Sequence, residues 1–175
     1  MQRNLDVSHY RNGDEIPQVQ DNTAWRNLTT GAWCYYENNT ANGTVYGKLY
    51  NWYAVNDPRG LAPNGYHIPS ELEWKLLKDF LGGETAAVGK ITAPTTWDTP
   101  QANANSTGFT ALAAGSRRYN AGDFISLGIA AKFWSSTISI PALSEAEFCY
   151  LGSGSFIAGS TSENPIAGMS VRCVK

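Results

Sequence analysis

The chain has few of the residues that build common catalytic metal sites. Its 175 residues include two histidines, His9 and His67, and three cysteines, Cys34, Cys149 and Cys173. The cysteines lack the close spacing of a zinc knuckle, and they allow one disulfide with one thiol left over. The sequence also lacks a phosphate-binding loop, a dinucleotide-binding glycine motif and a calcium-loop motif. We therefore predict no metal ligand and no cofactor, and we assign no catalytic residue.

Charge of either sign is also scarce. Charged residues make up 16% of the chain, and the formal net charge is −2. Typical globular domains contain roughly 25% charged residues, and a protein that binds phosphate backbones needs a basic surface. Nucleic acid is therefore excluded as an expected partner. No run of about 18 apolar residues occurs, so we do not expect direct membrane insertion.

What the chain does contain is enough apolar surface for a folded core. Apolar residues make up 42% and aromatic residues 12% of the sequence, and the length fits one domain over residues 1–175. Helical signals come first and strand signals later, which predicts an α+β fold.

Two helices are predicted in the first half. Ser70 and Glu73 form a capping-box pattern, and Gly82-Gly83 can end the helix, so we expect a helix over 71–81 packed on one face. Aromatic and aliphatic residues between Tyr46 and Val55 favour a second, short helix. Residues 84–107 are rich in Thr, Ala, Pro and Asn, which predicts a long surface excursion with little regular structure.

Short antiparallel strands separated by loops are predicted in the second half. The apolar runs that indicate them are Phe109 to Ala113, Phe133-Trp134, Glu147 to Leu151 and Ser170 to Val174.

The residues that suggest chemistry also have structural interpretations. His67 is a candidate base for Ser70 or a cysteine, but a lone histidine before a helix cap is more often a packed structural residue. Glu71 and Glu73 point to different helix faces, so they do not form an acid/base pair. Trp74 and Trp134 can stack on a sugar ring, although burial in the core accounts for them more simply.

An ordered set of segments resembles the Fibrobacter succinogenes major paralogous domain. They are Asn4-Leu5-Asp6-Val7, Tyr10-Arg11-Asn12-Gly13, Tyr46-Gly47-Lys48-Leu49-Tyr50-Asn51-Trp52, Gly65-Tyr66-His67-Ile68-Pro69-Ser70 with Glu73-Trp74, Leu81-Gly82-Gly83, Gly108-Phe109-Thr110-Ala111-Leu112, Phe133-Trp134-Ser135-Ser136-Thr137 and Ser170-Val171-Arg172-Cys173-Val174. The resemblance implies a C-type-lectin-like fold of the formylglycine-generating-enzyme type, with two helices, small antiparallel sheets and long loops. It also implies an extracellular location, on a cell surface or a virion surface. Met1 looks like an internal methionine of that family, so we expect a longer protein with its export signal upstream.

Two functional branches follow from this resemblance. The enzyme branch oxidises a substrate cysteine with its own cysteine pair, and only Cys149 and Cys173 suit that role here. Cys149 departs from the family pattern, so burial or a disulfide explains both residues better. The other branch resembles the variable proteins of diversity-generating retroelements, in which adenine-directed mutation never yields Lys, Glu, Gln, Met or Trp. Between Ile138 and Ala167 only Glu145, Glu147 and Glu163 are of those types, a count little below that elsewhere in the chain.

Position is therefore more informative than count. Isolated apolar side chains in Gly/Ser loops are costly to expose together unless they bind something. We predict a binding face made of Tyr119, Asn120, Ile125, Ser126, Ile129, Ile138, Ile140, Phe148, Tyr150, Ser153, Ser155 and Phe156. The alternative is that half of these residues fill a small core.

The expected function is a non-catalytic module that recognises a protein or glycan ligand on a cell surface. Its scaffold would be held by the helix at 71–81, the two buried tryptophans and a closing strand at Ser170 to Val174. The alternatives are a cysteine oxidase of the formylglycine-generating type and a structural adhesin or fibre component.

Overall fold

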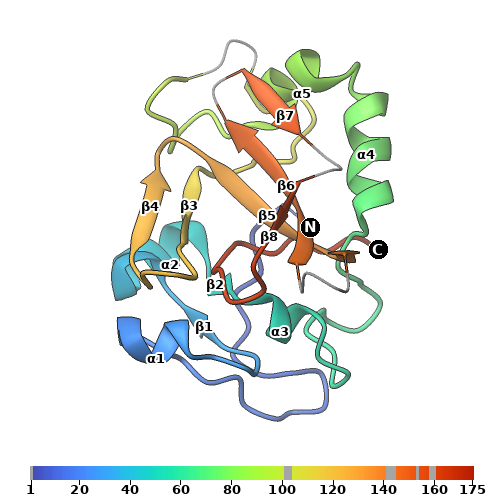
Figure 1. Ribbon diagram of the computed structural model, residues 1–175. Helices are drawn as coiled ribbons and strands as arrows, with labels where there is room; N and C mark the ends of the chain where they lie inside the picture. The colour runs from blue at the N-terminus through green and yellow to red at the C-terminus, as the bar shows by residue number, and fades with distance from the viewer. Residues whose placement is uncertain (1, 101–103, 141–144, 153, 158–160) are drawn as a thin grey trace.

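The structure, a computed structural model, describes residues 2–100, 104–140, 145–152, 154–157 and 161–175. Figure 1 shows helices around a central sheet, with the shorter N-terminal elements at one end. The helices are α1 (Asn22–Arg26), α2 (Thr40–Tyr46), α3 (Trp52–Val55), α4 (Glu71–Phe80) and α5 (Glu84–Ile91), with a 3-10 turn, η1, at Tyr36–Asn38. The strands are β1 (Trp33–Cys34), β2 (Leu49–Tyr50), β3 (Ala114–Arg117), β4 (Phe124–Leu127), β5 (Ala131–Ile140), β6 (Glu145–Gly152), β7 (Ser155–Ile157) and β8 (Ser162–Glu163).

The architecture is α+β, as the sequence predicts, but it is richer than two helices with small antiparallel sheets. Among the described residues five α-helices form, and the main sheet has six strands in the order β4-β3-β5-β6-β7, with β8 beside β6. That sheet is mixed, because β3 and β5 are parallel through Gly115 and Ala131. The remaining pairs in the sheet are antiparallel.

The long β5–β6 pair separates two hydrophobic clusters. Opposite residues on these strands include Phe133 with Cys149 and Trp134 with Phe148. Because successive side chains on a strand point to opposite faces, these two pairs serve different cores. Trp134 and Phe148 pack with Tyr50, Trp52 and Met169, whereas Phe133 and Cys149 pack with Trp74, Val88, Ile91 and Phe156. Both faces of this pair are therefore buried.

Helix α4 begins and ends almost where the sequence predicts. The Ser70 hydroxyl accepts from the Glu73 amide, and a Glu73 carboxylate oxygen accepts from the Ser70 amide at 2.8 Å, so the capping box is formed. Trp74 and Leu81 are buried against the second cluster. The interpretation of Trp74 and Trp134 as core residues is confirmed, since they are 2% and 0% exposed.

Other local predictions are wrong. The segment from Tyr46 to Val55 is not one helix: it contains the end of α2, then β2, then α3. Helix α5 lies inside residues 84–107, where little regular structure was expected, and it buries Ala87, Val88 and Ile91. Its apolar residues give a short, weakly periodic pattern, and tertiary contacts stabilise such helices more than propensity does.

The predicted closing strand at Ser170 to Val174 exists only as isolated bridges. Ser170 pairs with Phe133 and Val174 with His67. The N-terminal segment runs beside it, because the Leu5 amide donates to the Val171 carbonyl oxygen at 2.9 Å. The predicted strand at Phe109 to Ala113 is likewise reduced to one isolated bridge, between Ala111 and Thr92, and β3 begins only at Ala114.

A buried arginine joins the two chain ends to the middle of the chain. Arg172 donates from Nε to Asn4 Oδ1 and from its Nη atoms to the carbonyl oxygens of Phe109 and Thr110, at 2.7 to 2.8 Å. Burial lowers the pKa of Arg172 to about 10, so these acceptors hold a costly charge inside the protein. Such a residue fixes the position of three segments at once.

Candidate functional site

Three of the predicted binding residues meet at one small pocket. Tyr119 and Asn120 occupy the turn between β3 and β4, and Ile125 lies on β4. They border a hollow of about 110 Å³. Its other lining residues, which the sequence analysis did not assign, are Ser116, Arg117, Arg118, Lys132, Glu163, Ala167 and Met169.

Lys132 brings a cation to this pocket from β5. It lies opposite Tyr150 on β6, and its Nζ stands over the Phe148 ring, 5.5 Å from the centroid. Burial lowers the pKa of Lys132, and the nearby Glu163 carboxylate opposes that shift. Within the described residues no carboxylate lies within ion-pair distance of this ammonium. Its hydrogen-bonding capacity is therefore open to a ligand.

Glu163 supplies an acceptor to the same pocket. It ends β8, which pairs with β6 through Ala146 and Glu147, and its Oε1 accepts from the Asn164 amide at 3.0 Å. The pocket thus combines a donor, an acceptor and the apolar side chains of Ile125 and Met169. That mixture is typical of sites that orient a ligand by a few polar contacts on an apolar floor.

Arg117 holds the turn that carries Tyr119 and Asn120, rather than contacting a ligand. It is fully buried, and its guanidinium is stacked over the Trp25 ring at 4.4 Å. Its nitrogens donate to the carbonyl oxygens of Gly122, Val19 and Gln20 and to Asn22 Oδ1, at 2.7 to 3.0 Å. Because its donors are used internally, Arg117 is a positioning residue.

The backbone of the turn adds to this fixation. Gly122 has φ +72°, and a Cβ there would lie 2.5 Å from the Asn22 carbonyl oxygen. Only glycine permits both that conformation and that approach. The neighbouring Arg118 forms an ion pair with Asp123 across the same turn. The rim of the pocket is therefore held at defined positions.

Two predicted binding residues are buried, so their assignment is wrong. Phe148 is 7% exposed and packs edge-on against Trp134, while Phe156 is 0% exposed and belongs to the second cluster. The two rings lie in cores on opposite sides of the sheet. The pattern misled because strands covered on both faces lack the regular alternation of apolar and polar residues that marks a strand with one exposed face.

The remaining predicted residues do not gather at the pocket. Ile129, in the turn after β4, and Ile138, on β5, are 52% and 41% exposed but do not line it. Ser126, Tyr150 and Ser155 are half-buried on their strands. Ser153 and the side chain of Ile140 lie outside the described residues.

A signal for Lys132 was present in the sequence. In a strand that contains the buried Trp134, the residue two positions earlier shares its face. A lysine at a core-facing position is therefore unusual and marks a polar opening at the edge of the core. Glu163 carried no comparable signal, because its segment reaches the pocket only through tertiary folding.

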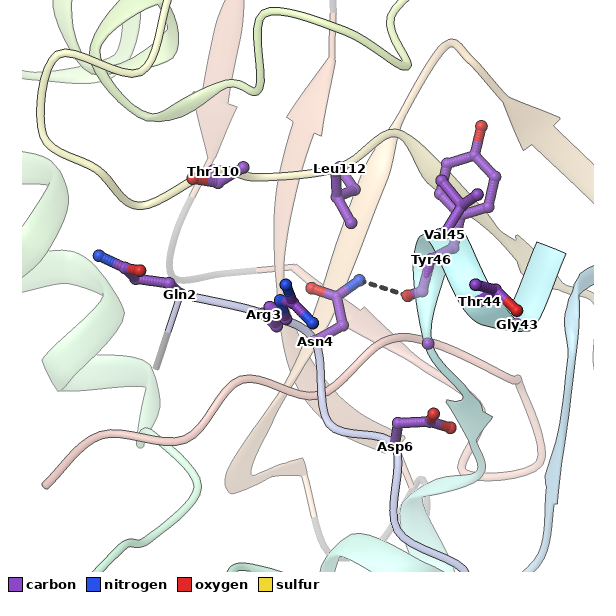
Figure 2. Close-up of a pocket in the computed structure, with 11 residues that line it drawn as sticks. Gln2, Arg3, Asn4, Asp6, Gly43, Thr44, Val45, Tyr46, Thr110 and Leu112 are labelled. Carbon is purple, nitrogen blue, oxygen red and sulfur yellow. Dashed lines mark hydrogen bonds between the residues drawn. The ribbon is translucent and has the colours of Figure 1, made fainter. Parts of the chain in front are cut away.

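A second, larger hollow of about 550 Å³ lies between the N-terminal segment and α2 (Figure 2). Asn4 points across it, and its Nδ2 donates to the Tyr46 carbonyl oxygen at 2.8 Å. Asn4 also contacts Arg172, and Asp6 is paired with Lys48 at 2.7 Å. The polar groups of Asn4 and Asp6 are thus engaged in contacts within the protein. They are therefore less available to a ligand.

The cysteines are arranged as core residues. All three are buried and outside any disulfide, with Cys149 and Cys173 in different clusters. Burial raises the pKa of Cys149, and it raises the pKa of Cys173 to about 11. A nucleophilic cysteine needs its thiolate form, which this environment disfavours. Among the described residues no group of three potential metal ligands occurs.

His67 is not the packed residue that was expected. Its side chain is 53% exposed, and its Nε2 lies 2.7 Å from Glu73 Oε1. The other carboxylate oxygen of Glu73 accepts from the Ser70 amide and hydroxyl. Glu73 thus stands between His67 and Ser70, so the histidine does not face the hydroxyl that it was a candidate to deprotonate. The group functions as a helix cap.

The chain matches the model of the Fibrobacter succinogenes major domain over residues 1–175. It belongs to that family. Curated proteins and solved structures gave no match. No helix in the described part of the chain combines the length and apolar character needed to cross a membrane.

Proposed function

We propose that this family member is a non-catalytic recognition module built on a C-type-lectin-like scaffold. Its ligand site is the pocket bordered by Tyr119, Asn120 and Ile125, with Lys132 and Glu163 supplying polar contacts. The observation that carries this proposal is that Tyr119 and Asn120, on a turn that Arg117 holds, line one pocket with the Lys132 ammonium, which has no carboxylate partner among the described residues.

The dimensions of the pocket limit what enters it. A volume of about 110 Å³ suits one side chain of a protein or one substituent of a sugar, not a whole macromolecule. The entering group accepts a hydrogen bond from Lys132 and donates one to Glu163, as a hydroxyl does. Tyr119, which is 37% exposed at the rim, adds apolar contact with the surrounding ligand surface.

The proposed function requires no cofactor. The proposed location of the module is outside the cell, on a cell or virion surface. If the gene is diversified by a retroelement, the changes should fall on exposed positions such as Tyr119 and Asn120 and spare Phe148 and Phe156 in the cores. A near-copy of the segment encoding residues 119–174, beside a reverse transcriptase gene, would test that extension.

Binding arrays test the recognition function directly. Labelled protein is applied to printed glycans and to printed cell-surface proteins, and each signal is measured again with Tyr119→Ala and Lys132→Met. We expect both variants to lose about tenfold or more in affinity, because contacts in a buried pocket dominate binding. The matched control is Val45→Ala, which alters a 51% exposed side chain at the second hollow and should change nothing.

Two results would overturn the proposal. One is a ligand whose affinity falls with Val45→Ala but not with Tyr119→Ala. The other is oxidation of a cysteine peptide by the protein that disappears in Cys149→Ser, which would favour the oxidase alternative.

A further inference from the structure

The outer face of α4 carries a row of exposed apolar side chains. Leu72, Leu76 and Phe80 are 59%, 58% and 86% exposed. They are spaced four residues apart, so they line one side of the helix. Figure 1 shows α4 at the edge of the molecule, with the sheet on one side only. Isolated exposed apolar residues are ordinary, but a contiguous row marks an interaction surface.

The helix cannot bury this row by rotating. Trp74 faces the core, and Leu76 stands roughly 200° around the helix from it. The start of α4 is held by the capping box and by the Glu71 amide, which donates to Thr137 Oγ1 on β5 at 3.1 Å. The exposure of the row is therefore a property of the fold and not of a loose helix.

An ion pair flanks the row on one side. Lys75 Nζ lies 2.8 Å from Asp79 Oδ2, and both side chains are about half exposed. Along one helix this order is the less favourable one, because an acid stabilises a helix better when it precedes the base. Asp79 also stands near the C-terminal, partly negative end of the helix dipole. The pair is therefore poorly placed for its own helix.

The same two charges are well placed for an antiparallel copy. We propose that the outer face of α4 binds the outer face of α4 in a second copy of this chain, about a two-fold axis at Leu76. Leu76 then meets its counterpart, and Leu72 meets the partner's Phe80. With a rise of about 1.5 Å per residue, Lys75 lies roughly 3 Å along the axis from both the partner's Asp79 and the partner's Lys75, on the same side of the interface. Asp79 is the nearer of the two, because it stands about 60° around the helix from Leu76 and Lys75 about 100°.

Charge complementarity selects this occupant. A two-fold axis produces two equivalent contacts between Lys75 of one chain and Asp79 of the other. The dipoles of antiparallel helices are also aligned favourably. Three side chains and their immediate neighbours bury less surface area than the roughly 800 Å² per partner of a stable interface. The dimer should therefore be weak and concentration-dependent. The surface is separate from the ligand pocket and does not depend on the proposed function.

Sedimentation of the full chain over a wide concentration range tests the interface. The wild-type protein should dimerise, and Leu76→Glu should abolish dimerisation, because it buries two like charges at the axis. Lys75→Glu and Asp79→Lys should each weaken self-association about tenfold or more, since each places like charges opposite one another. The control Arg26→Glu makes the same charge change as Lys75→Glu but on α1, and it should leave the dimer intact.

Mixing the two charge variants gives the decisive result. The Lys75→Glu chain and the Asp79→Lys chain together restore both cross-helix contacts, so they should form a heterodimer although neither forms a homodimer. Misfolding cannot produce this rescue. A wild-type chain that stays monomeric at every concentration, a dimer unaffected by Leu76→Glu, or a mixture that does not associate would overturn the proposal.

Discussion

The phenylalanines of the sheet and the apolar row of α4 show opposite outcomes for the same residue types. Phe148 and Phe156 come from segments that suggested exposed binding loops, yet they are 7% and 0% exposed. Leu76 and Phe80 come from a helix that was predicted to pack on one face, yet they are 58% and 86% exposed. Residue type did not decide burial in either region.

The number of covered faces explains the difference. The β5–β6 pair has a hydrophobic cluster on each side, so Phe133, Trp134 and Phe148 are buried whichever face they point to. Helix α4 has the sheet on one side only, so Leu76 and Phe80, which lie away from Trp74, stay largely exposed. Local sequence indicates how apolar a segment is, but not how many layers will cover it.

The largest difference in stability is expected when a phenylalanine is replaced by alanine in each of the two regions. Phe156→Ala should cost about 3 to 5 kcal/mol of the free energy of unfolding, because it removes a fully buried ring and leaves a cavity. Phe80→Ala should stay within roughly 0.5 kcal/mol, because its ring is exposed. Urea unfolding below the dimerisation range measures both. Equal losses would mean that the two rings share the same environment.

The helix cap provides a second, smaller test, because it fixes which side of α4 faces outward. Ser70→Ala removes the hydroxyl that accepts from the Glu73 amide and donates to its carboxylate, and it should cost about 0.5 to 2 kcal/mol. Thermal unfolding followed by circular dichroism measures the loss. Ser70→Asp, which keeps an acceptor for the Glu73 amide, should recover part of it. No recovery would contradict the capping role.

The smallest effect is the pH dependence of the same cap. Burial acts to raise the pKa of Glu73, but hydrogen bonds from Ser70 and the contact with His67 outweigh it and hold the pKa below 4.5. A carboxyl with a lowered folded-state pKa stabilises the protein above its unfolded value, and this contribution disappears as pH falls through the folded value.

The melting temperature of the wild type should therefore exceed that of Glu73→Gln at neutral pH, and the gap should narrow below about pH 4.5. Glu71→Gln serves as the control, since the described contacts include no hydrogen bond to the Glu71 carboxylate. A gap that stays constant down to pH 3 would show that the charge of the Glu73 carboxylate does not contribute to stability.

Part of the fold could be predicted from local signals. The capping box and the glycine pair define α4, because these interactions lie within a few residues of one another. Helix α5 and the division of residues 46–55 were missed, because contacts with distant segments decide them. The β2 pairing of Tyr50, for example, is with Trp33.

The candidate site was predicted in part for the same reason. Tyr119, Asn120 and Ile125 lie within seven residues of sequence, and they do border the pocket. Lys132 and Glu163 join them from β5 and β8, and Arg117 holds the turn through acceptors near residue 20. Those partners are brought together by the sheet, so no local pattern identifies them as a set.

By itself the sequence determined the α+β class, the family, the cap of α4 and the burial of Trp74 and Trp134, because each depends on residue type or on neighbours along the chain. Only the tertiary structure decided that Phe148 and Phe156 lie inside, that Leu76 and Phe80 lie outside, and that Lys132 and Glu163 line one pocket. Burial and pairing are relations between segments far apart in the chain, and folding alone sets which surfaces meet.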